Sequence, residues 1–156
     1  TINKYELITE TGHLKLDRVG YSSLAYPFAY GCIPKTWDED GDPLDIEIVS
    51  VTEPLVPGSI VEARIIGVMK FDDGGEIDDK IIAVLSDDKR MDHIKTYEDL
   101  GSHWLKETTY YWEHYKDLKK PGTCRVNAFL GIEEAIKVIE DCEERYKKEI
   151  EPNLVD

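Results

Sequence analysis

The stretch Asp-Gly-Asp-Pro-Leu-Asp brings three carboxylates close together along the chain: Asp40, Asp42 and Asp45. Gly41 permits a tight turn and Pro43 restricts φ to about −65°, so we expect a stiff loop that leads into a strand. Hard cations such as Mg²⁺ take oxygen ligands, often one or two protein carboxylates, with water and phosphate oxygens completing the shell. An EF-hand does not fit, because Pro43 would occupy the position of the turn glycine. Taken alone, such a motif is more often a solvated acidic turn than a metal site.

A second acidic turn follows one predicted strand later, in the stretch FDDGGEIDDK that ends at Lys80. It contains five carboxylates: Asp72, Asp73, Glu76, Asp78 and Asp79. By itself this stretch is a hairpin turn around two glycines, where charge needs no function. If both acidic turns lie at one rim of the same β-structure, they would repel strongly without a counterion. The pair therefore indicates a site for several metal ions.

Cationic and phenolic residues elsewhere in the chain supply the other half of a phosphate site: Lys4, Arg18, Tyr26, Tyr30, Tyr115 and Lys116. Arginine binds phosphate oxygens through its fork of donors, lysine acts as a point charge, and a tyrosine hydroxyl donates one hydrogen bond. Ordinary ion pairs with nearby carboxylates would explain each of these residues separately. The sequence has no glycine-rich phosphate loop, no serine elbow and no metal-like histidine pair, so we favour metal-activated water as the nucleophile.

The hydrophobic pattern predicts β-structure first and helices later. Residues 5–8 and 13–17 flank a turn at Gly12 and predict a hairpin. Alternating or continuous apolar runs predict further strands over residues 44–51, 60–69, 80–86 and 123–131. Apolar residues at helical spacing predict helices over residues 102–118 and 131–150. We expect one domain, 1–156, built as a β-barrel with a helix before and after its last strand.

Composition excludes several classes of function. A net charge of −14 over 156 residues would repel DNA or RNA, so we expect no nucleic-acid partner. No segment approaches the roughly 18 apolar residues of a membrane span. Three widely spaced cysteines, Cys32, Cys124 and Cys142, match neither a zinc pattern nor a disulfide framework. Reduced thiols and a cytoplasmic location are the expectation. We also expect plain surface charge at three acidic residues of the first motif: Asp38, Glu39 and Glu47.

Seven blocks, in order along nearly the whole chain, resemble the soluble family I inorganic pyrophosphatases: NKYE, DR, YPFAYG, DGDPLD, GVMKFDDGGEIDDKIIAV, DHIK and EHYKDL. The resemblance implies a mostly β (α+β) fold, a five-stranded OB-like closed barrel with two main helices packed outside it. It implies Mg²⁺-dependent hydrolysis of pyrophosphate to two orthophosphates, with several ions bound and with Mn²⁺ or another divalent ion as a substitute. By analogy with short bacterial members it also favours a homo-oligomer, a hexamer in particular.

The resemblance also assigns roles to individual residues. Asp42 corresponds to the general base, and Tyr30 to a polar residue of both the catalytic and the substrate-binding set. The expected metal ligands are Asp40, Asp45, Asp73 and Asp78, with Asp45 shared between two ions. The expected phosphate-binding residues are Lys4, Arg18, Lys80, Tyr115 and Lys116. Two further residues are expected to support the site: Glu6 and Tyr26. Asp72 matches less well than Asp73, because the spacing to Lys80 favours the latter.

These roles define a mechanism that fits the charge of the substrate. Two metals could share one water and lower its pKa from about 15.7 toward neutrality. Asp42 could then accept the proton if it lies within hydrogen-bond reach. In-line attack on one phosphorus would spread charge onto the equatorial and leaving oxygens, which the cationic residues would stabilise.

Two other functions stay open at this point. One is a non-catalytic OB-like module that binds divalent cations. The family's further metal-associated glutamate would precede Thr1, so either the chain is trimmed or this ligand is missing, and a missing ligand would favour the cation-binding module. Against it stand Lys4, Arg18, Tyr115 and Lys116, which a cation buffer would not need. The other is a metal-dependent phosphatase acting on nucleotides, for which the sequence offers no evident aromatic platform to stack a base.

Overall fold

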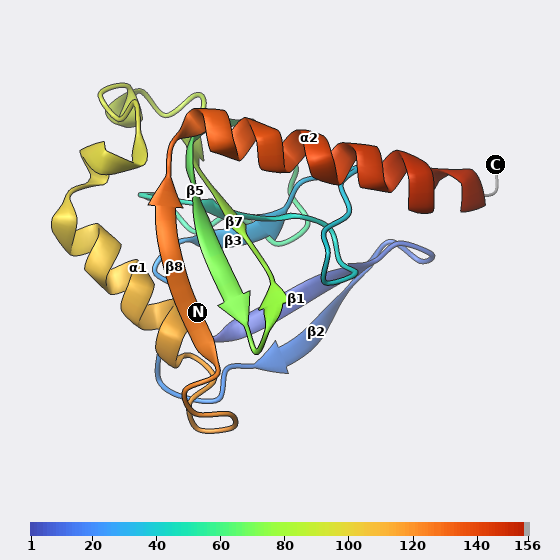
Figure 1. Ribbon diagram of the computed structural model, residues 1–156, viewed down its shortest axis with the longest axis horizontal. Helices are drawn as coiled ribbons and strands as arrows, with labels where there is room; N and C mark the ends of the chain where they lie inside the picture. Colours follow the sequence, from blue (N-terminus) through green and yellow to red (C-terminus); the bar gives the residue numbers. More distant parts are fainter. Residues whose placement is uncertain (155–156) are drawn as a thin grey trace.

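The first two strands form a hairpin of their own. The computed structural model describes residues 1–154, and in it β1 (Asn3–Ile8) pairs antiparallel with β2 (His13–Val19) as a two-stranded sheet. Gly12 has a φ of 69°, a backbone conformation that L-residues with side chains rarely adopt, and the Gly12 amide donates to the Ile8 carbonyl at 2.8 Å. The predicted hairpin is confirmed, and its position across the lower part of the molecule is visible in Figure 1.

Six strands form the main sheet: β3 (Ala29–Cys32), β4 (Asp45–Ile48), β5 (Ala63–Asp73), β6 (Glu76–Ile77), β7 (Lys80–Leu85) and β8 (Cys124–Leu130). Their order is β3-β4-β7-β5-β6. Strand β8 also pairs with β5, along the edge of β5 opposite β7. Only β4 and β7 run parallel among these pairs within residues 1–154. The predicted strands over 44–51, 60–69, 80–86 and 123–131 are all present with shifted ends. The short strands β3 and β6 were not predicted.

The fold is mostly β with two long helices, as expected. Within residues 1–154 the strand pairing describes an open sheet plus a separate hairpin, without a pairing that joins the edges into a ring. Closure into an OB-like barrel therefore stays a prediction. None of the helices in this part of the chain is both long enough and apolar enough to cross a bilayer.

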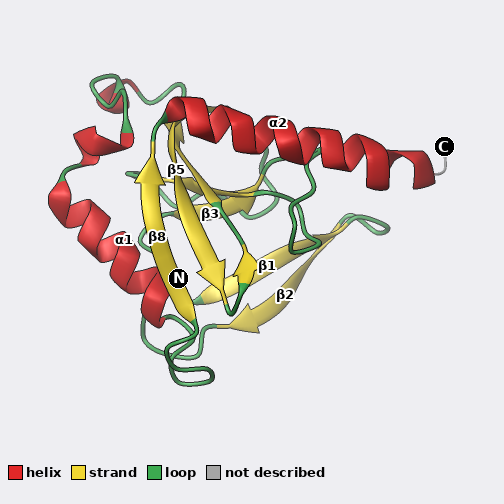
Figure 2. Cartoon of the chain, in the orientation of Figure 1, coloured by secondary structure: helices red, strands yellow, loops and turns green. Residues whose placement is uncertain are grey.

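The two helices cover different parts of the sheet, as Figure 2 shows. Helix α1 (Ser102–His114) lies along β8, and α2 (Ile132–Glu149) packs on β5. The predicted helix over 102–118 ends four residues early: the Tyr115 amide still donates to the Tyr111 carbonyl at 2.8 Å, and a run of turns follows. As a result Tyr115 and Lys116 lie on the turn that leads back to the sheet. Three short 3-10 helices complete the described chain: Lys89–Met91, Tyr97–Leu100 and Glu151–Asn153.

Two hydrophobic clusters hold these layers together. One lies between α1 and the sheet and contains the aromatic residues Phe28, Phe71, Tyr111 and Trp112. The other lies beneath α2, where Ala135 and Cys142 pack with Leu44, Val68 and Ile81. Strands β4 and β7 are therefore covered on both faces. Because of this double coverage, the acidic residue Glu47 of β4 is completely buried.

Candidate active site

A stiff loop carries the first acidic motif into β4. The Thr36 hydroxyl donates to the Ile33 carbonyl at 2.6 Å and accepts from the Leu44 amide at 2.9 Å, which closes the base of the loop. At its tip, the Asp38 amide donates to the Asp42 carbonyl at 2.7 Å, and Gly41 has a φ of 83°. The tight turn expected at Gly41 is confirmed. The loop thus presents its carboxylates from a fixed backbone.

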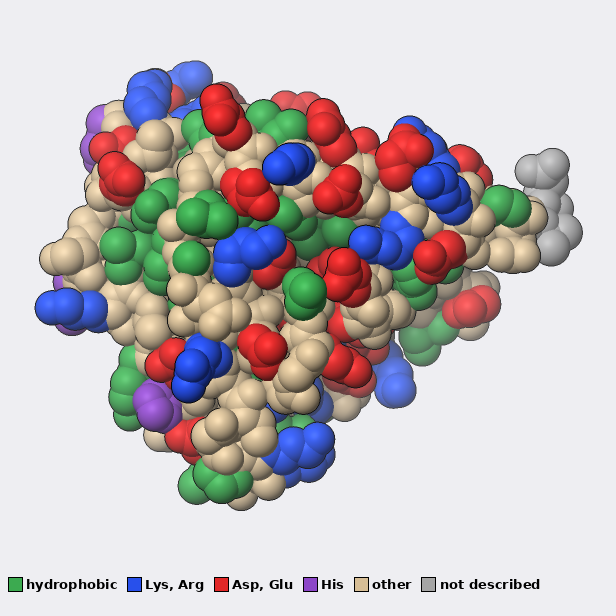
Figure 3. Space-filling model, in the orientation of Figure 1, with side chains coloured by type: hydrophobic (Ala, Val, Ile, Leu, Met, Phe, Trp, Pro, Cys, Tyr) green, Lys and Arg blue, Asp and Glu red, His purple; other side chains and the backbone are tan. Residues whose placement is uncertain are grey.

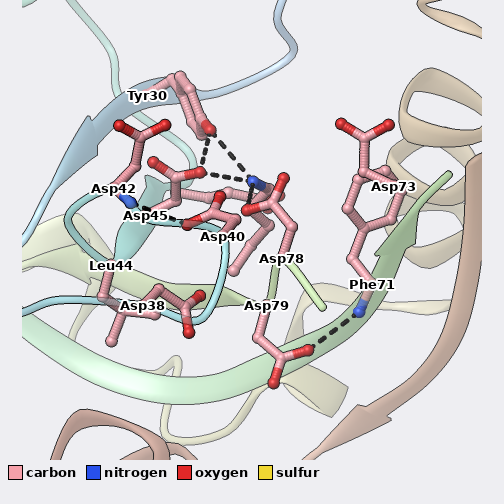
Figure 4. A network of polar contacts seen from close by, with 12 residues as sticks. Tyr30, Asp38, Asp40, Asp42, Leu44, Asp45, Phe71, Asp73, Asp78 and Asp79 are labelled. Atoms are coloured by element: carbon pink, nitrogen blue, oxygen red, sulfur yellow. Dashed lines mark hydrogen bonds and ion pairs between the residues drawn. The ribbon is translucent and has the colours of Figure 1, made fainter. Parts of the chain in front are cut away.

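The carboxylates of this loop lie close to one another at the start of β4 (Figure 4). The Asp42 amide donates to Asp40 Oδ1 at 3.1 Å. Burial raises the pKa of the Asp40 carboxyl to about 6, and the negative charges of Asp38, Asp42 and Asp45 add to the increase, although the hydrogen bond from the Asp42 amide opposes it. Burial and the neighbouring carboxylates therefore disfavour the charged form of Asp40 more than the hydrogen bond from the Asp42 amide favours it.

The second acidic turn reaches the same place through Lys80. In the parallel pair β4–β7, Asp45 is the register partner of Lys80. The Lys80 ammonium is 1% exposed and donates to Asp45 Oδ2 and to Asp78 Oδ1, both at 2.5 Å, and to the Tyr30 hydroxyl at 3.2 Å. The Tyr30 hydroxyl in turn donates to Asp45 Oδ2 at 2.5 Å. Figure 4 shows these contacts as a connected network.

Burial and charge shape the pKa values of this network. Burial raises the pKa of Asp78 to about 7, and the nearby charge of Asp45 adds to the effect while Lys80 opposes it. Burial also raises the pKa of Tyr30 well above its usual value, so its hydroxyl remains a donor. Burial alone would lower the pKa of Lys80, but the charges of Asp45 and Asp78 outweigh it and raise that pKa. Lys80 is therefore a permanent cation between two carboxylates.

A separate ion pair forms beside the network at the end of β5. The Lys116 ammonium bonds to Asp73 Oδ2, and the Cys124 thiol donates to Asp73 Oδ1 at 3.5 Å. Burial favours a higher pKa for Asp73, but the bond from Lys116 outweighs it and lowers that pKa. The neighbouring Asp72 carboxylate instead accepts from the Gly75 amide at 2.7 Å within the hairpin turn. The two adjacent aspartates thus have different partners.

Two of the predicted phosphate-binding cations, Lys4 and Arg18, lie on the β1–β2 hairpin, and Arg18 also lines a small pocket. Lys4 and Arg18 are register partners across β1 and β2. Lys4 bonds to Glu6 at 2.8 Å and lies 3.7 Å from Asp17. Arg18 lines the pocket together with four tyrosines: Tyr21, Tyr26, Tyr111 and Tyr115.

Two tyrosines connect this pocket to the acidic network. Burial raises the pKa of Tyr115, and the charges of Asp73 and Asp78 act in the same direction while Arg18 opposes them. Tyr26 stacks on Tyr30 with ring centroids 5.3 Å apart and ring planes at 12°. The hairpin cations, the tyrosines and the acidic network therefore converge on one region.

Sequence reasoning was wrong about two acidic residues of the first motif. Asp38 is 6% exposed and Glu47 is 0% exposed, whereas both were expected to be plain surface charge. Glu47 Oε1 accepts a hydrogen bond at 2.5 Å from Nε1 of Trp112 on α1, and burial raises the pKa of Glu47 to about 8. Both residues belong to an acidic run, which is typical of an exposed segment. The residues that bury them, Trp112 on α1 and Cys142 on α2, come from distant parts of the chain.

A family model described as inorganic pyrophosphatase matches residues 1–147. The chain belongs to the inorganic pyrophosphatase family. The inorganic pyrophosphatase of Neisseria meningitidis serogroup B is 45% identical over 148 residues, which are 94% of this chain and 83% of that protein. The inorganic pyrophosphatase of Geobacillus stearothermophilus is 43% identical over 147 residues, 94% of this chain and 88% of that protein.

Solved structures of inorganic pyrophosphatases agree with this fold. The crystal structure from Neisseria gonorrhoeae superposes with a TM-score of 0.89 at 45% identity and covers 95% of this chain and 86% of that one. The structure from Thermus thermophilus gives a TM-score of 0.86 at 38% identity, with coverages of 94% and 85%. The family resemblance drawn from the seven sequence blocks is confirmed. The roles of individual residues remain predictions.

Proposed function

We propose that the chain hydrolyses inorganic pyrophosphate to two orthophosphates, in a divalent-cation-dependent reaction with in-line attack by water. The observation that carries this proposal is the network around Lys80, in which a buried ammonium joins carboxylates from both acidic motifs beside a tyrosine hydroxyl. Family membership supports the substrate, and the convergence of the cations Arg18 and Lys116 with these carboxylates supports a phosphate site. A simple cation-binding module would not require those cations.

The donors present fit a hard divalent cation. Every proposed ligand supplies carboxylate oxygen, the donor that Mg²⁺ prefers. Burial raises the pKa values of Asp40 and Asp78, and the negative charges of neighbouring aspartates add to the increase, which a nearby divalent cation would oppose. In residues 1–154, no three or more His, Cys, Asp or Glu side chains are arranged so that they could hold a metal ion as they stand. Lysines contact three of the four proposed ligands. The proposed ligands are Asp40, Asp45, Asp73 and Asp78, and Mg²⁺ is the proposed ion, with Mn²⁺ as a substitute.

Each protein group has a defined part in the proposed reaction. When bound, the cations supply Lewis acidity that brings the pKa of a water toward neutrality. The exposed Asp42 carboxylate accepts the proton of the attacking water, while Tyr30 holds Asp45 through its hydroxyl. The substrate oxygens receive hydrogen bonds from Lys4, Arg18, Lys80, Tyr115 and Lys116, which stabilise the charge that develops on them. Glu6 holds Lys4, and Tyr26 supports the Tyr30 ring.

One assay separates this function from its two alternatives. Phosphate release is measured from pyrophosphate and from ATP, each with Mg²⁺ and with EDTA. We expect Mg²⁺-dependent release from pyrophosphate, much faster than from ATP, and loss of activity with EDTA. Release mainly from ATP would indicate a nucleotide phosphatase. The absence of release from either substrate, together with Mg²⁺ binding by calorimetry, would indicate a cation-binding module.

We further infer the setting in which this enzyme works. One domain, 1–156, is proposed for the chain, and the contacts of β5 with β7, β8 and α2 support it for the described residues 1–154. The proposed location is the cytoplasm, which is supported by free thiols at Cys32, Cys124 and Cys142. A homo-oligomer, in particular a hexamer, is proposed by analogy with short members of the family. The barrel expected from the resemblance would form if the edge of β3 closed against the remaining strands.

A further inference from the structure

A buried polar pair lies beneath the proposed phosphate site and has no role in the function proposed so far. Trp112 is 2% exposed, and its Nε1 donates to Oε1 of the fully buried Glu47 at 2.5 Å. In the described part of the chain, the second carboxylate oxygen of Glu47 has no hydrogen-bond partner. A leucine would fill a similar volume without burying an unpaired polar atom. Hydrophobic packing alone therefore does not explain why residue 47 is a glutamate.

The indole of Trp112 contacts several of the proposed substrate-binding side chains. Its ring centroid lies 4.9 Å from Lys80 Nζ and 5.5 Å from the Tyr30 ring. It also lies 5.2 Å from the Tyr115 ring, with the two planes at 81°. These three partners come from β7, from β3 and from the turn after α1. A single ring therefore contacts three parts of the site that are distant in sequence.

We propose that Glu47 is a positioning residue, which holds the Trp112 indole in one orientation and thereby places Lys80, Tyr30 and Tyr115 for binding pyrophosphate. The inference rests on the proposed function, because it needs these three side chains to contact phosphate. An indole has a flat face and a polar edge, so its attraction for the Lys80 ammonium depends on its orientation. Without the bond from Nε1, the ring can tilt and its three partners can shift. Displacements of about 1 Å are large on the scale of a reacting site.

Four variants separate positioning from packing. Glu47→Gln keeps an acceptor of the same shape, Glu47→Leu removes it, and Trp112→Phe removes the donor but keeps an aromatic ring. The double variant Glu47→Leu/Trp112→Phe replaces the polar pair by an apolar one, so no buried donor or acceptor of the pair is left unpaired. We expect its thermal stability to match or exceed that of the wild type, because replacing both partners of a buried polar pair is often neutral.

The measurements are kcat and KM for pyrophosphate with Mg²⁺, and the dissociation constant of inorganic phosphate by calorimetry. We expect KM and the phosphate dissociation constant to rise about tenfold in Glu47→Leu, in Trp112→Phe and in the double variant. Glu47→Gln should stay within about twofold of the wild type. A merely structural role would reduce the active fraction, and hence the apparent kcat, at unchanged KM. That result, or wild-type KM in the stable double variant, would overturn the proposal.

Phosphate binding makes the two inferences separable. If the wild type released no phosphate from pyrophosphate, the proposed hydrolysis would fail. Weaker phosphate binding in Glu47→Leu would then still support the positioning role, whereas unchanged phosphate binding would refute it.

Discussion

Lys80 shows how one side chain can serve both the fold and the site. Its ammonium is almost completely buried and pairs with Asp45 and Asp78 at 2.5 Å. Two carboxylates and one ammonium leave an excess of negative charge, which a divalent cation would neutralise if it displaced or supplemented the lysine. In the proposed site, Lys80 and the cations would therefore share the same ligands. Stability and cation binding should be linked through this residue.

Replacing Lys80 tests that linkage. We expect Lys80→Met to lower the free energy of unfolding by about 3–5 kcal/mol without Mg²⁺, because it leaves Asp45 and Asp78 buried beside each other without their partner. Added Mg²⁺ should recover part of the loss. Urea unfolding with EDTA and with Mg²⁺ measures both quantities. An equal loss of stability in the two conditions would contradict a shared site.

Asp42 should separate catalysis from cation binding. We expect Asp42→Asn to lower kcat by about 10²–10⁴-fold, because the amide cannot accept the proton of the attacking water. The Mg²⁺ dissociation constant should change little, since Asp42 is not a proposed ligand. Steady-state kinetics and calorimetry with Mg²⁺ provide the two values.

Asp72→Asn is the matched control for this variant. Asp72 accepts from the Gly75 amide in the hairpin turn, and an asparagine oxygen can do the same. We expect wild-type kcat in this control. A wild-type rate in Asp42→Asn would remove Asp42 from the role of general base.

At the residue level, the sequence reveals where acidic residues cluster more readily than which of them are buried. The two acidic motifs can be recognised because the aspartates, Gly41 and Pro43 follow one another in a short stretch. Glu47 could not be placed in the same way, since its burial depends on Trp112, which lies 65 residues further along the chain. Tertiary packing brings Trp112 against Glu47, and no local pattern in the sequence predicts this contact.

Among the elements, α2 supports the acidic loop from outside the site. The Trp37 amide donates to the Cys142 carbonyl at 2.9 Å, and Arg145 Nη1 donates to the Trp37 carbonyl at 2.8 Å. The Cys142 thiol donates to Asp38 Oδ1 at 3.6 Å, and Arg145 lies 3.9 Å from the same oxygen. Burial raises the pKa of Asp38, so this carboxylate depends on its partners to remain charged. Helix α2 thus holds the backbone that precedes Asp40 and Asp42.

Removing Arg145 should loosen the acidic loop. We expect Arg145→Met to lower the free energy of unfolding by about 1–3 kcal/mol, because Asp38 loses its nearest cation and Trp37 loses a donor. The Mg²⁺ dissociation constant should rise as well, since the loop must be ordered before it binds. Thermal unfolding and calorimetry are the measurements.

Lys147→Met provides the control on the same helix. Among residues 1–154, Lys147 pairs only with the exposed Glu144, so we expect neither stability nor Mg²⁺ affinity to change measurably. An unchanged Mg²⁺ affinity in Arg145→Met would show that α2 stabilises the fold without supporting the site.

Helices and strands could be predicted where nearby residues in the sequence, such as turn residues or a hydrophobic periodicity, specify them. The β1–β2 hairpin and α2 have clear turn and helix periodicities, and both were found. Strand β3 escaped prediction because it has only four residues and includes Gly31, so its pairing with β4 determines its structure. The end of α1 was also missed, since Tyr115 continues the apolar periodicity although the helix has already ended at His114.

On the scale of the whole molecule, the surface combines charge with an apolar stripe. The face in Figure 3 carries interspersed acidic and basic side chains over α2 and below it. The hairpin β1–β2 differs, because five large hydrophobic residues on it are about half exposed: Tyr5, Leu7, Leu14, Leu16 and Val19. Tyr5 pairs with Leu16 and Leu7 pairs with Leu14, so they lie side by side. Contiguous exposed apolar residues are typical of interaction surfaces.

The oligomeric state follows as a prediction from this stripe and the family analogy. We expect sedimentation equilibrium to give a multiple of the 17.9 kDa chain mass. Leu16→Lys should lower that mass, because a charge in a buried apolar interface lacks a partner. Ile136→Lys on α2 is the matched control, since Ile136 is similarly exposed but lies away from the hairpin, and we expect it to leave the mass unchanged. A monomeric wild type would refute the homo-oligomer. A smaller mass in Ile136→Lys alone would move the interface to α2.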